Sequence, residues 1–282
     1  MTSRRNFLKK AVLVSAAVPV LQNELLAFPS VSKRTGLALY TIRDAMMANP
    51  EESLDKVAEA GYDWVEAANH DPGLFYGMKP AKFGKLVKKS GLELISTHSQ
   101  IRPENADTII AEAAEAGFSY LVLPSLPSEW SGTLDGFKKA ADIFNGFGEK
   151  CRKEGLKFSF HNHQVEYNDI NGKVPFDILA DRTDEDIVTF EMDLAWITAA
   201  GKDPLDYFRK YPGRFEMWHL KDLSPDKQDA TLGEGIIDFR PIIAKYRQAG
   251  MRYWFIEQDN CTTHSPMESI VISRNYFLEK LR

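Results

Sequence analysis

Short apolar runs alternate with longer amphipathic segments along the chain from Leu37 onward. A short apolar run bounded by turn residues is typical of a buried strand, and the longer segments repeat their apolar residues with a helical period. The pattern predicts eight strands, at residues 37–41, 64–67, 92–97, 120–123, 157–160, 187–192, 215–220 and 253–256. Eight strands that alternate with helices favour an α/β fold, a single (β/α)8 barrel.

Glycine punctuates this alternation, because it ends helical segments directly before a strand. The five glycines in this position are Gly61, Gly91, Gly117, Gly155 and Gly250. Asn49 precedes Pro50 as the predicted N-cap of one helix. The short helix-to-strand turns predict one face of the barrel. Longer strand-to-helix segments, at 69–79, 124–133, 164–174 and 222–237, predict the opposite face, where the active sites of such barrels lie.

The first thirty residues belong to a different class of segment. The sequence SRRNFLK at residues 3–9 is followed by an apolar stretch from Ala11 to Val20, which is too short to span a bilayer comfortably. SRRNFLK resembles the twin-arginine export signal of bacteria, which implies a periplasmic location. We therefore expect residues 1–30 to be a cleaved signal and residues 31–282 to form the barrel domain, with no stable membrane insertion after cleavage.

Composition and charge narrow the function further. The 282 residues are 44% hydrophobic and 27% charged, as in an ordinary soluble globular protein. Without residues 1–28 the chain keeps 31 basic and 39 acidic side chains, a formal charge of −8. That charge offers no general attraction to nucleic acid or to an anionic membrane. Cys151 and Cys261 are expected to be free and mostly buried thiols.

Four metal-ligand side chains each lie at the end of a separate apolar run: His161, Asp193, His219 and Glu257. Because parallel strands of a barrel end at one face, these side chains are expected to meet around one divalent ion. Their nitrogen and oxygen atoms suit Zn²⁺, Mn²⁺, Co²⁺ or Mg²⁺. His161 and His163 lie on the same face of their strand, so either histidine could be the first ligand.

Further side chains at this face are candidates for contact with a substrate. Glu66 and His98 end the second and third strands, and Glu166 lies in the loop after the HNH triplet. Lys221 follows His219 closely enough to line a pocket, and Trp196 follows Asp193 as a candidate pocket wall. For each of them a salt bridge, a hydrogen bond to a neighbour or a place in the core is the alternative to a functional role.

Several long motifs fall at these strand ends, and together they carry a resemblance to a known family. They are YTIRD, FHNHQVEY, FEMDLAWITAAGKDPLDYF, YPGRFEMWHLKD, LGEGIIDF and YWFIEQD. The chain resembles the sugar isomerase/epimerase branch of the xylose isomerase-like TIM barrels. This superfamily is also called apurinic endonuclease family 2-like, because those nucleases share the barrel. The resemblance implies one divalent metal ion held by the last four strands, with Asp193, His219 and Glu257 as ligands and a small carbohydrate bound beside it. It also implies that homo-oligomers are common.

One departure from the family pattern bears on mechanism. Ketose epimerases of this branch use two glutamates on opposite sides of the sugar, and here His161 stands where many relatives have the first of them. The catalytic candidates are therefore Glu257 with His161 or His163 as its partner. A base that removes the proton beside a carbonyl gives an enediolate, which can lead to isomerisation, epimerisation or loss of a leaving group.

Three functions follow as alternatives. The first is a metal-dependent isomerase or epimerase of a non-phosphorylated sugar or keto-sugar, because the chain shows no glycine-rich phosphate loop and its expected location is outside the cytoplasm. The second is a lyase or hydratase of 3-keto-glycosides, and the third is a sugar-binding barrel without catalysis. The related nucleases use an additional histidine three residues after the aspartate, where this chain has Trp196, so a nuclease is not expected.

Overall fold

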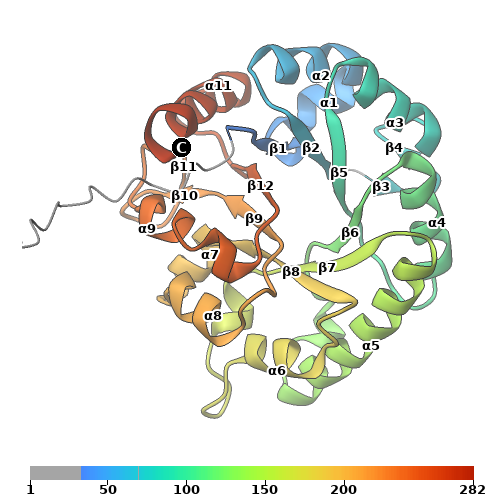
Figure 1. The fold of residues 1–282 in the computed structure, drawn as a ribbon, viewed down its shortest axis with the longest axis vertical. Coiled ribbons are helices and arrows are strands. Elements are labelled where there is room, and N and C mark those ends of the chain that lie inside the picture. The colour runs from blue at the N-terminus through green and yellow to red at the C-terminus, as the bar shows by residue number, and fades with distance from the viewer. Residues whose placement is uncertain (1–32, 69) are drawn as a thin grey trace, which may run out of the picture.

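The fold is a closed barrel of eight parallel strands, as the sequence predicts (Figure 1). The computed structural model describes residues 33–282 apart from residue 69, so the expected export signal lies outside the described residues. Around the barrel the strand order is β1-β12-β9-β8-β7-β6-β5-β2. The barrel strands are β1 (Gly36–Ala38), β2 (Trp64–Ala67), β5 (Glu93–His98), β6 (Tyr120–Leu123), β7 (Lys157–His161), β8 (Val188–Asp193), β9 (Met217–Leu220) and β12 (Tyr253–Ile256).

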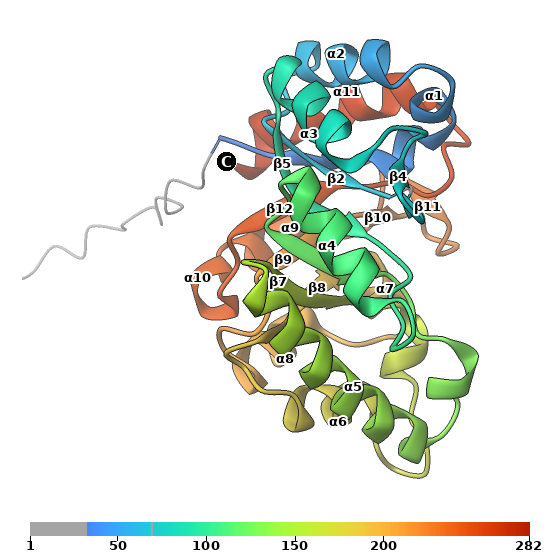
Figure 2. The same ribbon diagram turned by 90° about the vertical axis from the view of Figure 1, so that its right-hand side faces the viewer.

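Helices form the outer ring and separate successive strands, as Figures 1 and 2 show from two directions. They are α1 (Arg43–Ala48), α2 (Pro50–Glu59), α3 (Pro80–Lys89), α4 (Ala106–Ala116), α5 (Leu134–Lys153), α6 (Pro175–Arg182), α7 (Leu194–Ala199), α8 (Pro204–Lys210), α9 (Phe239–Ile243), α10 (Tyr246–Ala249) and α11 (Pro266–Tyr276). Short helical turns lie at η1 (Leu39–Ile42), η2 (Ser128–Trp130), η3 (Gln164–Tyr167) and η4 (Phe277–Leu281). In the described part of the chain, none of the helices is both long and apolar enough to cross a bilayer.

The predicted strand bounds agree with the structure at β2, β6 and β12 and differ most at the first strand. That strand ends at Ala38, and the predicted residues beyond it form the η1 turn. Leu39, Thr41 and Ile42 are all buried, a spacing that fits a tight helical turn and not the alternation of a strand. The long strand-to-helix segments hold two small hairpins that the sequence pattern did not reveal: β3 (His70–Asp71) with β4 (Leu74–Phe75), and β10 (Asp222–Leu223) with β11 (Asp229–Ala230).

The predicted helix signals are confirmed. All five punctuating glycines have positive φ, for example +88° at Gly61 and +82° at Gly250, a conformation that costs other residues strain. The side chain of Asn49 accepts a hydrogen bond from the backbone N–H of Glu52 at 3.3 Å and so caps α2. All the barrel strands pair in parallel, so the polar residues at their carboxyl-terminal ends gather at one face.

The barrel interior changes character from one end to the other. Toward the amino-terminal ends of the strands it is filled by aromatic rings, with Tyr253 packed against Trp64 at 5.4 Å and Tyr120 at 5.9 Å between ring centroids. Glu66, two residues after Trp64 on β2, is a fully buried ionisable group, as are Glu191 on β8 and His219 on β9. Aromatic rings therefore fill one end, and the other end holds a cluster of buried ionisable groups under the long loops.

The close packing of α3 against the end of α4 gives a first stability prediction. A Cβ atom at Gly84 would lie 2.0 Å from the backbone oxygen of Ala116, which cannot move without shifting α4. Gly84→Ala is expected to lower the free energy of unfolding by roughly 1–3 kcal/mol. Gly146→Ala in α5 meets nothing within 4 Å and should raise it by about 0.5–1 kcal/mol through helix propensity. Urea denaturation of both variants tests the pair, and a Gly84→Ala protein as stable as Gly146→Ala would contradict the packing argument.

Candidate metal centre and active site

Asp193, His219 and Glu257 converge at the carboxyl-terminal face of the barrel. They come from β8, β9 and the residue after β12, and one ligand atom of each lies within 4.8 Å of the others. His219 Nδ1 is 2.7 Å from Glu257 Oε2 and 4.0 Å from Asp193 Oδ2. Asp193 and His219 are direct neighbours in the β8–β9 register, which explains why their side chains meet. Two carboxylates and an imidazole at these separations form a set that can hold a divalent cation.

The hydrogen bonding of the Asp193 carboxylate fits a cation bound among these three side chains. Its Oδ1 accepts the backbone N–H of Trp196 at 2.8 Å and caps α7, whereas its Oδ2 is buried and accepts no hydrogen bond. A buried carboxylate oxygen without a donor is costly unless a positive charge faces it. Lys221 Nζ lies 3.3 Å from that oxygen, so the local chemistry already draws positive charge toward it.

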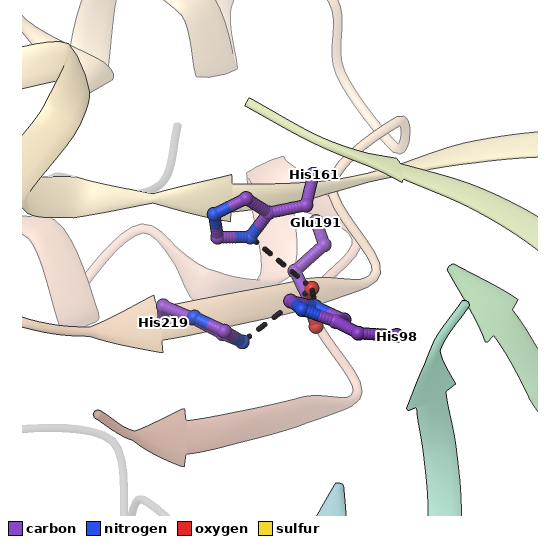
Figure 3. Close-up of side chains that lie close together, drawn as sticks. All are labelled: His98, His161, Glu191 and His219. Atoms are coloured by element: carbon purple, nitrogen blue, oxygen red, sulfur yellow. Dashed lines mark hydrogen bonds and ion pairs between the residues drawn. The ribbon is translucent and has the colours of Figure 1, made fainter. Parts of the chain in front are cut away.

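His161 approaches the same centre from β7. Its Nε2 is 3.9 Å from Asp193 Oδ2, and its Nδ1 is 3.3 Å from Glu191 Oε2. His161, His98 and His219 surround the carboxylate of Glu191, and these four residues offer a second group of converging ligand atoms (Figure 3). The four side chains expected to share one ion are therefore close together, but His161 also belongs to a deeper cluster.

Lys221 lies among carboxylates at the edge of the centre. Its Nζ is 2.8 Å from Glu257 Oε2 and 2.8 Å from Asp259 Oδ2. It also lies 5.5 Å from the ring centroid of Trp196, over the face of the indole. Although burial opposes the charged form, Glu257, Asp193 and Asp259 hold the pKa of Lys221 well above its usual value, so the side chain is an ammonium ion.

Burial and neighbouring charges shift the pKa values of the carboxylates and imidazoles around the centre in different directions. Burial raises the pKa of Asp193 to about 6, with Lys221 and His219 opposing the rise. Burial acts in the same direction on Glu257, but His219 and Lys221 hold its pKa well below the usual value. Burial lowers the pKa of His161 well below the usual value and, with Lys221, that of His163 to about 4, so both imidazoles are neutral near pH 7. Neutral imidazoles and ionised carboxylates are the forms in which these groups bind metals.

A cavity of about 370 Å³ opens above the centre. Its lining is mostly polar and comes from the ends of seven barrel strands and the loops that follow them: Tyr40, Ala68, His98, Ser99, Gln100, Pro124, Ser125, His161, His163, Lys221, Glu257 and Asp259. The volume is in the usual range for a small-molecule site. The lining offers hydroxyl, amide, imidazole and carboxylate groups, which suit a ligand rich in hydroxyls.

The family model described as the xylose isomerase-like TIM barrel matches residues 54–271, which is more than half of the chain. The chain belongs to this family. The match covers the centre and most of the cavity, so the resemblance in the strand-end motifs is confirmed at the level of the family.

Curated relatives of this xylose isomerase-like barrel include inosose dehydratases. The chain is 26% identical over 165 residues to the inosose dehydratase of Lacticaseibacillus casei, 29% over 158 residues to that of Geobacillus kaustophilus and 23% over 193 residues to that of Clostridium perfringens. These matches cover 51%, 49% and 61% of this chain and 54%, 48% and 64% of the relatives. The chain thus spans about half to two thirds of the length of the curated relatives it matches.

Solved structures of other proteins show the same fold. A sugar phosphate isomerase/epimerase from Parabacteroides distasonis superposes with a TM-score of 0.79 at 24% identity, covering 89% of this chain and 96% of the other. The IOLI protein with a bound zinc atom gives 0.71 at 14% identity, covering 87% and 97%. L-ribulose 3-epimerase gives 0.67 at 16% identity, covering 87% and 94%. At these identities the likeness shows the fold alone.

Within this barrel the predicted substrate residues lie at different depths. His98, His163 and Lys221 line the cavity. Glu66 is fully buried below it, where its Oε1 is 2.8 Å from His219 Nε2 and its Oε2 accepts the hydroxyl of Ser96 at 2.7 Å. Contact between the cavity residues and a substrate stays a prediction, whereas Glu66 reaches the centre through His219.

Two other predicted residues, Glu166 and Trp196, do not line the cavity. The carboxylate of Glu166 is buried and accepts the backbone N–H of His163 at 2.7 Å. Trp196 packs beside His163 with 5.6 Å between ring centroids. Glu166 thus contacts the backbone of His163, and Trp196 contacts its ring. A direct contact with substrate would require either side chain to move.

Glu191 and Asp259 are site residues that the sequence reasoning missed. Each lies two residues from a predicted ligand, Glu191 before Asp193 and Asp259 after Glu257. Residues two apart on a strand point to the same face, so this spacing was a usable signal for Glu191. Asp259 lies beyond the end of β12, where the strand period no longer applies.

Glu166 gives a prediction about the pH dependence of stability. Burial raises its pKa to about 7 from the usual 4.5, although the N–H of His163 partly opposes the rise. Between these two values the unfolded chain loses the proton while the folded protein keeps it, so stability decreases as pH rises through that window. The shift corresponds to about 3 kcal/mol.

Glu166→Gln removes this titration. In metal-free protein, the free energy of unfolding of the variant relative to the original is expected to rise by about 3 kcal/mol between pH 4.5 and 8. Urea denaturation at the two pH values measures the difference. A difference that does not change with pH would show that Glu166 titrates normally.

Proposed function

We propose that the protein is a divalent-metal-dependent enzyme that removes a proton next to the carbonyl of a non-phosphorylated keto-sugar or keto-polyol. The observation that carries the proposal is the convergence of Asp193, His219 and Glu257 beneath a polar cavity that Glu257 lines, with Asp193 Oδ2 buried and accepting no hydrogen bond. Those three side chains, with Nε2 of His161, would hold the ion. When bound, a divalent ion at this place polarises a carbonyl and orients the adjacent hydroxyl.

The residues of the chain supply a base and an acid. Glu257 lines the cavity and is ionised, and its two carboxylate oxygens allow one to face the centre while the other accepts a proton from carbon. Lys221 lies 2.8 Å from Glu257 as an ammonium ion and can donate a proton to a developing oxyanion. His163, neutral and at the cavity wall, is the candidate for the second proton transfer.

The cavity supports a substrate without phosphate. Among the described residues that line it, Lys221 is the only lysine or arginine, and it is already paired with Glu257 and Asp259. A phosphate dianion would meet these carboxylates without a free cation to receive it. Hydroxyl groups of a sugar or cyclic polyol could instead bind Ser99, Gln100 and Ser125.

Dehydration is the second candidate outcome of the same proton abstraction. A symmetric epimerase needs equivalent groups on the two faces of the substrate carbon, whereas this cavity has its two carboxylates, Glu257 and Asp259, both beside the Lys221 ammonium, with neutral imidazoles at His161 and His163. An unlike pair suits elimination, because the base takes the proton from carbon and the acid delivers one to the departing hydroxide. The inosose dehydratases among the curated relatives support this candidate.

Proton exchange from solvent tests the proposal. The metal-loaded protein would be incubated in D₂O with free sugars, inososes and 3-keto-glycosides, and NMR would follow the carbon-bound protons. The proposal predicts deuterium next to the carbonyl, with an epimer, an isomer or a dehydrated product identifying the outcome. Tight binding of a sugar without any exchange would leave a sugar-binding barrel and overturn the enzymatic reading.

We also infer that residues 1–30 direct export through the twin-arginine route. The support is the SRRNFLK sequence followed by the apolar stretch from Ala11 to Val20. Arg4→Lys with Arg5→Lys keeps the charge and should retain the protein in the cytoplasm of the producing bacterium. Fractionation of the cells measures this, and undiminished periplasmic protein would contradict the inference.

A further inference from the structure

A fully buried glutamate lies beneath the candidate metal centre and meets three imidazoles. Glu191 Oε2 is 2.7 Å from His98 Nε2, 3.3 Å from His161 Nδ1 and 3.4 Å from His219 Nε2. The histidines come from three different strands, β5, β7 and β9, and their rings surround the carboxylate (Figure 3). A carboxylate buried to this degree needs donors, and imidazole N–H groups provide them.

In His161, and likewise in His219, the two nitrogens of the imidazole ring face different partners. On His161, Nδ1 faces Glu191 and Nε2 faces Asp193 Oδ2 at 3.9 Å. On His219, Nε2 faces Glu66 and Glu191, and Nδ1 faces Glu257. Each ring therefore presents one nitrogen to a buried carboxylate and the other to the candidate centre. A histidine that binds a metal needs this division, because the metal takes the unprotonated nitrogen and the other N–H needs an acceptor.

The two buried glutamates serve different rings. Glu66 Oε1 is 2.8 Å from His219 Nε2, closer than the 3.4 Å of Glu191, so Glu66 is the nearer acceptor for His219. The hydrogen bond of His161 Nδ1 is to Glu191. In the β7–β8 register His161 is the direct neighbour of Glu191, which fixes this pairing through the backbone.

We propose that Glu191 is a positioning residue that accepts the Nδ1 proton of His161 and thereby leaves Nε2 of that ring free to be the fourth ligand of the ion at Asp193, His219 and Glu257. This inference rests on the proposed function in requiring an ion there. It assigns the ligand role to His161 and leaves His163 at the cavity wall.

Metal affinity and ring protonation test the proposal together. Glu191→Gln replaces the carboxylate with a group of the same shape that accepts an imidazole proton less strongly. The dissociation constant for Zn²⁺, measured by competition with a chelator, is expected to rise by roughly 10- to 100-fold. The matched control is Glu216→Gln, another buried glutamate, which directly precedes β9, accepts the hydroxyl of Tyr120 at 2.7 Å and lies toward the opposite end of the barrel. It should bind Zn²⁺ as the original protein does.

Long-range ¹H–¹⁵N NMR of the zinc-loaded original protein gives a second readout that a merely structural residue would not set. His161 should carry its proton on Nδ1 and bind the metal through Nε2. A proton on Nε2 would overturn the proposal even if Glu191→Gln failed to fold.

The number of zinc ions bound per chain, measured for the original protein and for Glu191→Gln, separates the remaining outcomes. One zinc ion per chain, weakened in Glu191→Gln, supports the positioning role. Two ions in the original protein and one in the variant would make the lower cluster a second metal site and overturn it. Equal affinity in both proteins would also overturn the positioning role alone, whereas an original protein that binds no divalent ion would remove the proposed function itself.

Discussion

Glu257→Gln is expected to reduce the exchange of solvent deuterium into a bound keto-sugar by on the order of 10³-fold or more. The carboxylate of Glu257 lines the cavity beside the candidate centre and is held ionised by His219 and Lys221 despite its burial, so it is placed to accept a proton from a substrate carbon. An amide of the same shape cannot accept that proton and contributes no charge to the ion. The rate of deuterium incorporation, followed by NMR at saturating metal, measures the effect.

The control for this substitution is again Glu216→Gln. Glu216 is a buried glutamate with hydrogen-bonding partners of its own, but it does not line the cavity. Its loss should change stability without changing the exchange rate of the folded protein. If Glu257→Gln exchanged deuterium as fast as this control, Glu257 would have no part in the proton transfer.

Asp193→Asn is expected to raise the dissociation constant for a divalent metal by more than roughly 10- to 100-fold. That range is the cost of losing a residue that only hydrogen-bonds to a metal ligand, and Asp193 is proposed to be a ligand itself. The substitution is specific because the two oxygens of Asp193 have separate roles. Oδ1 caps α7, a role that asparagine also fills, while the buried Oδ2 loses its charge. Isothermal titration with Zn²⁺ or Mn²⁺ measures the loss.

Asp203→Asn makes the same chemical change at the next helix. Asp203 caps α8 through Oδ1, which accepts the N–H of Leu205 at 2.8 Å, and its side chain is exposed. The two variants should have similar stability, and only Asp193→Asn should lose the metal. Equal affinity of the two for the ion would remove Asp193 from the ligand set.

The sequence predicted the parts of the fold that depend on local pattern. Every barrel strand was found because a short apolar run between helical segments is a local feature, and the glycine turns were found because positive φ favours glycine. The end of the first strand was not, since the η1 turn is set by contacts across the barrel, such as the hydrogen bond from the Gln258 N–H to Thr41. The buried residues of this turn are Leu39, Thr41 and Ile42. In so short a segment this spacing cannot be told from the pattern of a buried strand.

The candidate site was predictable only where one strand end carried one ligand type. Asp193, His219 and Glu257 stood out because each ends an apolar run, and the structure brings them together. The spacing from Asp193 indicated only that Glu191 faces the same side of the strand, because the three imidazoles it meets come from other strands, which the barrel register brings to it. Glu166 looked accessible in a loop, yet it folds back onto the N–H of His163. Side-chain direction in loops follows from such contacts and not from sequence spacing.

The location of a bound ion tests the central claim most directly. Crystals of the protein loaded with Zn²⁺ or Mn²⁺, measured at the absorption edge of the metal, would show the ion as an anomalous difference peak. The account predicts one peak about 2.0–2.3 Å from Asp193 Oδ2, His219 Nδ1 and a carboxylate oxygen of Glu257. A fully loaded crystal with no peak among these three side chains, or with its ion bound elsewhere, would contradict it.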